Sequence, residues 1–181
     1  MILGDSEIKN LVLENHVPIQ SYKLINPASM NVRIGTTFLV PRRKLFGGVA
    51  LGSKVEYRRI LLREGESFKL RPGQFALATT MERIDLPSDL AAFVQGRSSI
   101  GRAGLTVQNA GFIDPGFHGH ITLELKNETR NSIIIRPGYP VAQIVFEQAT
   151  GVTSPYRGKY NGQIEATGSR MYMDEFPDSS K

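Results

Sequence analysis

The sequence predicts an all-β protein, mainly strands with short helices, folded as a distorted β-barrel or jelly-roll-like domain. Beyond residue 14 helical periodicity almost vanishes, and apolar residues come in short runs. Turn signals separate these runs, including Arg71-Pro72-Gly73, Asp114-Pro115-Gly116 and Arg136-Pro137-Gly138. Many short strands between glycine and proline turns are typical of barrels and jelly rolls. The 181 residues, 40% of them hydrophobic, are enough for one domain with a real core.

The expected elements follow in chain order. A short helix is predicted from about Asp5 to Glu14, with Asp5 as its N-cap and Ile8, Leu11 and Val12 as its apolar stripe. The expected strands are Met30–Ile34, Thr37–Val40, Glu56–Leu62, Ser67–Leu70, Phe75–Thr80, Ala92–Gln95, Ile121–Leu125, Ile133–Ile135 and Val141–Phe146. Residues 1–150 form the predicted β domain. Residues 151–181 are poor in large aliphatic side chains, which indicates either a mobile terminus or an arm that orders over a ligand or a neighbouring subunit.

The amino-acid composition alone excludes few classes of binding partner. The formal net charge is +5, but basic residues are scattered apart from Arg42-Arg43-Lys44, and small anions such as nucleotides explain the surplus as well as nucleic acid does. No nucleic-acid motif accompanies the charge, so no nucleic-acid partner is expected. No apolar run approaches the roughly 18 residues of a membrane span, and the N-terminus does not resemble a signal peptide. A cytoplasmic protein without a membrane partner is expected.

The absence of cysteine bears on metal chemistry. Zinc-dependent nucleobase deaminases hold their metal with His and Cys ligands. This chain has three histidines and no cysteine, and His118 and His120 would need further ligands. A structural or surface role is favoured for both histidines, and any deamination by this chain is expected to proceed without zinc.

A first candidate segment is Gly96-Arg97-Ser98-Ser99-Ile100-Gly101-Arg102. Two guanidinium groups and two hydroxyls on a glycine-containing backbone could cradle a phosphate, and Ser98 could cap a short helix whose amides point at an anion. The alternative is a polar turn with surface arginines, which the pattern alone slightly favours.

A second candidate segment runs from Val107 to Leu125. Strand alternation puts Thr122 and Glu124 on one face and Leu123 on the other. Glu124 is an ordinary surface residue if its face is solvated. If that face lines a pocket, burial would raise the pKa of Glu124 and suit it to moving protons. Asp114 could be a binding residue or only a turn former.

A third candidate segment is Pro155–Gln163. It offers two aromatic rings, two cations and side-chain amides. These groups could close over a base and a triphosphate, or they could do nothing in a surface tail.

Four segments together resemble the deoxycytidine triphosphate (dCTP) deaminase family, a relative of the trimeric dUTPases. They are Asn26–Gly35, Gly96–Arg102, Ala110–Leu125, and Lys159-Tyr160 with Gln163. The resemblance runs from about Ile2 to Tyr172 and implies a dUTPase-type (β-clip) fold. It also implies a homotrimer with sites between subunits, binding of dCTP and dUTP, dTTP as a candidate inhibitor, and Mg²⁺ carried by the triphosphate without protein metal ligands.

The resemblance assigns roles to individual residues. Glu124 matches the glutamate that activates water to attack C4 of cytosine, and Ser98 and Arg102 match residues that orient this water. Asp114 matches the aspartate that holds the deoxyribose 3′-hydroxyl. The remaining matches are Arg97 and Ser99 in the phosphate loop, Thr122 with the Leu123 backbone at the pyrimidine edge, and Tyr156, Lys159 and Gln163 in the arm that covers the phosphates.

The product is a finer implication. Ala110-Gly111 resembles the bifunctional branch, which deaminates dCTP and also cleaves the triphosphate to give dUMP and pyrophosphate. A small residue there leaves room for water near the α-phosphate. Two departures stand out: Asn31 replaces the usual aspartate, and Pro41–Lys54 fits no known pattern. The segment around Asn109 is also one residue shorter than in many family members.

Other functions stay open at this stage. A deaminase that releases dUTP lacks only the second step. A plain dUTPase would not require Glu124, and a non-enzymatic nucleotide-binding protein could keep the same scaffold.

Overall fold

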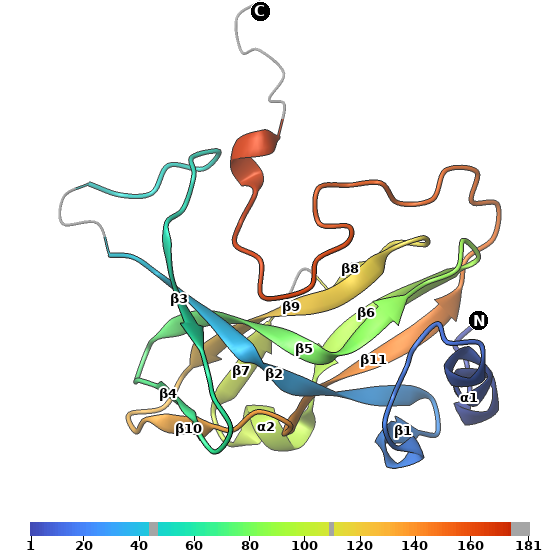
Figure 1. Ribbon diagram of the computed structural model, residues 1–181, viewed down its shortest axis with the longest axis horizontal. Helices are drawn as coiled ribbons and strands as arrows, with labels where there is room; N and C mark the ends of the chain where they lie inside the picture. Colours follow the sequence, from blue (N-terminus) through green and yellow to red (C-terminus); the bar gives the residue numbers. More distant parts are fainter. Residues whose placement is uncertain (44–46, 109–110, 175–181) are drawn as a thin grey trace, which may run out of the picture.

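The structure is a computed structural model that describes residues 1–43, 47–108 and 111–174 (Figure 1). Asn109 and Ala110 lie outside the described residues. The helical elements are α1 (Asp5–Leu13), α2 (Ser98–Arg102) and the 3₁₀ turns η1 (Tyr22–Leu24) and η2 (Met171–Met173). The strands are β1 (Ile25–Asn26), β2 (Ser29–Pro41), β3 (Tyr57–Leu61), β4 (Phe68–Leu70), β5 (Phe75–Asp85), β6 (Leu90–Gly96), β7 (Leu105–Gln108), β8 (Phe112–Ile113), β9 (His118–Asn127), β10 (Ile133–Ile135) and β11 (Pro140–Gln148).

Most of the strands belong to one large, strongly twisted sheet, which confirms the predicted mainly-β fold (Figure 1). Its antiparallel order is β7-β9-β5-β2-β11-β6-β8, with β1 and β3 also paired to β2. A second small sheet consists of β4 and β10. Every expected strand is present. Two expected strands, however, are one: β2 continues through Gly35, where a Cβ atom would lie 2.6 Å from Thr79 Cγ2 on β5.

The hydrophobic core lies between the inner faces of the sheet and α1. Its largest fully buried apolar side chains are Phe38, Phe146, Ile8, Met30, Ile34, Leu70, Ile84, Leu123, Leu125 and Ile144. Of the predicted apolar stripe of α1, Ile8 and Leu11 are buried as expected, whereas Val12 is only partly buried. The predicted cap is wrong: Gly4 is the N-cap, and Asp5 begins the helix with its carboxylate accepting a hydrogen bond from Lys9 Nζ at 2.5 Å. An (i, i+4) ion pair on the first turn replaces the side-chain cap.

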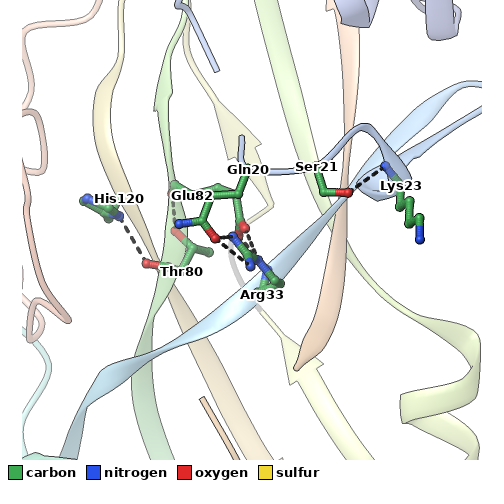
Figure 2. Close-up of polar contacts among 7 residues, drawn as sticks. All are labelled: Gln20, Ser21, Lys23, Arg33, Thr80, Glu82 and His120. Atoms are coloured by element: carbon green, nitrogen blue, oxygen red, sulfur yellow. Dashed lines mark hydrogen bonds and ion pairs between the residues drawn. The ribbon is translucent and has the colours of Figure 1, made fainter. Parts of the chain in front are cut away.

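A buried polar network fixes the middle of β5 (Figure 2). The pairing of β5 with β9 shifts register between Thr79 and Arg83, and Glu82 turns inward with a side chain 1% exposed. The Glu82 carboxylate accepts hydrogen bonds from Arg33 N and Nε, both at 2.6 Å. Thr80 Oγ1 donates to Glu82 O at 2.8 Å and accepts from Ile121 N at 2.9 Å. The network therefore ties β2, β5 and β9 together just before Thr122.

Asn31, the departure from the family aspartate, is buried on β2. Its Nδ2 donates to Asn26 Oδ1 at 3.3 Å. A neutral amide therefore closes the β1–β2 hairpin at this position.

The chain after β11 forms an arm that returns across β9 (Figure 1). Gly162 N donates to His118 O and His120 N donates to Gln163 O, both at 2.8 Å. The arm therefore pairs with its own chain like an extra strand. In the described part of the chain, no helix has the length and apolar character needed to cross a membrane.

Candidate active site

The strand β9 places Thr122 and Glu124 on the wall of a cavity of about 390 Å³. Its burial alternates as expected, since Ile121, Leu123 and Leu125 are buried in the core and Thr122 and Glu124 are only half-buried. This volume lies in the range of small-molecule sites. The face that carries Glu124 is therefore the wall of a pocket.

The Glu124 pocket is lined by residues from β3, β5, β8, the turn after β8, β9 and the arm. They are Tyr57, Phe75, Leu77, Gly111, Phe112, Ile113, Asp114, Phe117, Ile121, Thr122, Glu124, Tyr156, Tyr160, Gln163, Thr167, Gly168 and Ser169. The pocket thus joins two carboxylates, hydroxyls and an amide to aromatic walls. Such a mixture of apolar surface and a few polar groups suits a ligand with a flat ring and a sugar.

Burial raises the pKa of the Glu124 carboxyl above its ordinary value. No hydrogen bond or opposite charge contributes to this shift; desolvation is its cause. A carboxyl whose pKa is raised accepts a proton more readily near neutral pH. Glu124 is thereby suited to general acid–base chemistry.

Asp114 lies at the start of a tight turn beside the pocket. Phe117 N donates to Asp114 O at 3.1 Å, and Gly116, with φ +83°, occupies the third turn position behind Pro115. This is the pattern of a type II turn with proline second and glycine third. The turn leaves the Asp114 carboxylate exposed at the pocket, so its turn-forming and binding roles are compatible.

The arm closes one side of the pocket through Thr122. The Thr122 hydroxyl donates to Gln163 Oε1 at 3.1 Å and accepts from Thr167 N at 3.0 Å. Tyr156 is fixed beside Asp114, because its N donates to Pro115 O at 2.7 Å. Of the predicted arm residues, Tyr156 and Gln163 line the pocket, whereas Lys159 lies outside it and forms an ion pair with Asp174.

The segment Gly96–Arg102 does not line the pocket of its own chain. Ser98, Ser99 and Arg102 are exposed on α2, and Arg97 Nη1 donates to Pro140 O at 2.9 Å. The expected cap is again wrong, because Arg97 is the N-cap and Ser98 is the first helical residue without a side-chain capping bond. Leu123 is fully buried in the core, so only its backbone can face a ligand.

Sequence reasoning missed the contributions of β3, β5 and the distal arm to the pocket, namely Tyr57, Leu77 and Thr167–Ser169. The alternation of β5 could have placed Leu77, which pairs directly with Glu124. Tyr57 leaves no such signal, because β3 reaches the site only by pairing with β2.

Residues 2–149 match the family model described as dCTP deaminase-like. The chain belongs to the dCTP deaminase-like family. It is 39% identical over 180 residues to "dCTP deaminase, dUMP-forming" of Persephonella marina, covering 97% of this chain and 99% of the relative. It is 40% identical over 180 residues to the protein of the same name from a Sulfurihydrogenibium species, with 96% and 99% covered.

A solved dCTP deaminase from Agrobacterium tumefaciens shares the fold. Its TM-score is 0.64 at 23% identity, and the match covers 80% of this chain and 47% of that chain. The mainly-β dCTP deaminase-like fold is thus shown by both sequence and structure.

The described residues contain no group of three or more His, Cys, Asp and Glu side chains that could hold a metal ion. His118 is exposed, and His120 Nδ1 lies 3.1 Å from Thr80 O.

Proposed function

We propose that the protein deaminates dCTP and then cleaves the triphosphate. In the first step, dCTP and water give dUTP and ammonia. In the second step, dUTP and water give dUMP and pyrophosphate. The observation that carries the proposal is Glu124, a carboxyl with a raised pKa on the wall of a pocket that also contains Asp114 and Thr122.

Glu124 performs the proton transfers of deamination. Its carboxylate takes a proton from water as the hydroxide adds to C4 of cytosine, and the electron pair of the C4=N3 bond moves to N3. The tetrahedral carbon then carries both oxygen and nitrogen. Glu124 gives the proton to the amino group, the C–N bond breaks and ammonia leaves, while the hydroxyl proton passes to N3 as the C4=O bond forms. The raised pKa helps both halves of this cycle, because the same group must accept and donate the proton near neutral pH.

The remaining pocket residues position the nucleotide. Asp114 accepts a hydrogen bond from the deoxyribose 3′-hydroxyl, and Thr122 with the Leu123 backbone binds the pyrimidine edge. Because Thr122 is engaged by Gln163 and Thr167 in this structure, the arm must adjust when the base binds. Residues 151–181 then cover the nucleotide, with Tyr156, Lys159 and Gln163 over the phosphates.

The phosphates are bound by Arg97, Ser98, Ser99 and Arg102 of a neighbouring subunit in a homotrimer. Support comes from their positions: Ser98, Ser99 and Arg102 are exposed, and none of the four lines the pocket of its own chain. Ser98 and Arg102 would also orient the attacking water. Mg²⁺ carried by the triphosphate would neutralise its charge and assist departure of pyrophosphate.

The product assignment is supported by the relatives named "dUMP-forming" at 39–40% identity over nearly the whole chain. Gly111 lines the pocket with φ +62°. A side chain at this position would be strained and would fill space that a hydrolytic water needs. Ala110-Gly111 is therefore proposed to permit the second step.

Incubation of the purified protein with dCTP and Mg²⁺, followed by separation of products, tests the function. Equal amounts of ammonia, dUMP and pyrophosphate are expected. Ammonia with stable dUTP would refute triphosphate cleavage, and cleavage of dUTP without turnover of dCTP would show a plain dUTPase. Binding of dUTP or dTTP without any turnover would indicate a non-enzymatic nucleotide-binding protein.

A further inference from the structure

We propose that the β2–β3 hairpin is a latch that holds the C-terminal arm beside Glu124, and that Tyr57 is its main positioning residue. This inference rests on the proposed function for its catalytic consequence, but its structural part stands by itself. It also gives a role to Lys54, the last residue of the segment Pro41–Lys54, which the sequence left without one.

The hairpin contacts the arm at three places outside β9. Ser169 N donates to the Tyr57 hydroxyl at 3.2 Å. Arg59 Nε and Nη2 donate to Glu165 Oε2 at 3.0 and 2.5 Å. Lys54 Nζ lies 5.8 Å from the centroid of the Tyr172 ring. The hairpin and the arm therefore lie side by side in opposite chain directions, since Lys54, Tyr57 and Arg59 contact Tyr172, Ser169 and Glu165 in turn.

Tyr57 makes the most closely packed of these contacts. A Cβ atom added at Gly168 would lie 2.6 Å from Cε2 of the Tyr57 ring, so the arm backbone lies directly on that ring. Tyr57 also packs against a separate apolar cluster of Leu39, Leu77 and Ala166. Two of these come from β2 and β5 and the third from the arm. The cluster therefore fastens the arm to the outer face of the large sheet.

This fastening point is next to the proposed catalytic group. Leu77 of the cluster pairs in register with Glu124. Thr167, which follows Ala166 in the arm, donates its N–H to Thr122 on the same face of β9. The latch thus decides how closely the arm covers the Glu124 pocket.

The contacts between the hairpin and the arm are expected to stabilise the closed arm to different extents. Arg59 and Glu165 have side chains 52% and 43% exposed, and an exposed pair of this kind changes an equilibrium by less than about fivefold. The Tyr57 ring combines packing against Gly168 and Ala166 with the hydrogen bond from Ser169. Loss of the ring should therefore release the arm more than loss of the ion pair.

Release of the arm has a specific chemical consequence. Burial alone raises the pKa of Glu124, so opening the pocket should let this pKa fall toward its ordinary value. The titratable groups that share the pocket are Asp114, Tyr57, Tyr156 and Tyr160. On β9 itself the nearest charge on the same face is that of Lys126, which pairs with Glu128 at 3.1 Å.

The experiment compares Tyr57→Ala, Tyr57→Phe and Gly168→Ala in the full-length protein, with Tyr22→Ala as the control at an exposed tyrosine away from the arm. Trypsin cleavage in the arm after Arg157, Lys159 and Arg170 is followed by mass spectrometry. The dependence of kcat/KM for dCTP on pH is measured in parallel. Melting curves identify any variant that fails to fold, and Gly168→Ala then tests the same contact from the arm side.

Tyr57→Ala and Gly168→Ala should speed arm cleavage about tenfold and raise KM for dCTP. The acid limb of kcat/KM should move to lower pH, because ionised Glu124 then persists at lower pH. Tyr57→Phe keeps the ring and should lie between wild type and alanine. Unchanged cleavage and an unchanged pH profile in folded variants would overturn the latch. If the wild-type protein does not deaminate dCTP, the proposed function fails, while trypsin cleavage still tests the latch.

Discussion

Replacement of Glu82 by alanine perturbs the network that holds β2, β5 and β9 in register beside the candidate site. The Glu82 side chain is 1% exposed and receives two hydrogen bonds of 2.6 Å from Arg33, whose side chain is 20% exposed. Without the carboxylate, the Arg33 guanidinium keeps, among the residues that the structure describes, only the Gln20 side-chain oxygen, at 3.3–3.4 Å. The part-buried backbone N–H of Arg33 also loses its side-chain partner.

The magnitude follows from this geometry. Removing one partner of a buried ion pair lowers the free energy of unfolding by about 3–5 kcal/mol. Because Arg33 is partly exposed and water can reach it, we expect a loss of about 3 kcal/mol. For a chain of this size each kcal/mol lowers Tm by about 2–4 °C, so Glu82→Ala should lower Tm by about 6–12 °C.

Thermal and urea unfolding at one fixed protein concentration measure the effect, because assembly makes Tm depend on concentration. Arg59→Ala, which breaks an exposed pair, is the control and should cost less than about 1 kcal/mol. The double variant Arg33→Met/Glu82→Leu should recover much of the loss, since it leaves no unpaired buried charge. A loss below about 1 kcal/mol for Glu82→Ala would refute the assigned role of this network.

Three further predictions concern the pocket and the arm. Glu124→Gln should abolish deamination while nucleotide binding, measured by calorimetry, persists. Because the folded pKa of Glu124 is raised, the contribution of Glu124 to wild-type stability falls as pH rises through that pKa, so the variant should melt higher than wild type at neutral pH and equally below about pH 4; a gain that persists in acid would contradict this. Asp174→Asn removes the carboxylate that pairs with Lys159 and should lower KM for dCTP about two- to fivefold, whereas a higher KM would count against phosphate binding by Lys159. Gly119→Ala places a Cβ 2.6 Å from Gln163 O at φ +136°; the strain should detach the arm, and trypsin digestion as slow as in wild type would argue otherwise.

The fold was largely accessible from the sequence because its signals are local. Alternation and turn residues are properties of neighbouring positions, and they identified strands such as Ile133–Ile135 with correct bounds. The short strands β1, β7 and β8 were missed, because none of them contains three β-branched residues in a row as Ile133–Ile135 does. The division of β2 was wrong because Gly35 reads as a break. Its actual role is close approach to Thr79, a contact between distant residues.

The candidate site was accessible only in part, for the same physical reason. Alternation placed Glu124 and Thr122 on one face, and composition could not tell whether that face was covered. The cover comes from Tyr57 and the arm, which meet through strand pairing that no local pattern encodes. The N-cap predictions at Asp5 and Ser98 were each wrong by one residue. A residue type that is suited to capping therefore does not by itself locate the first residue of a helix.

The charge of the pocket indicates what a single chain can and cannot bind. Among the described residues that line it, none is a lysine or arginine, and two are carboxylates, Glu124 and Asp114. Such a lining suits a base and a sugar, whereas a triphosphate needs cations. Lys159 of the arm is paired with Asp174, and neither it nor Arg97 and Arg102 lines the pocket. We therefore propose that a complete dCTP site needs both a rearranged arm and a second subunit, and we expect deamination to be lost when the assembly dissociates even though each chain keeps Glu124.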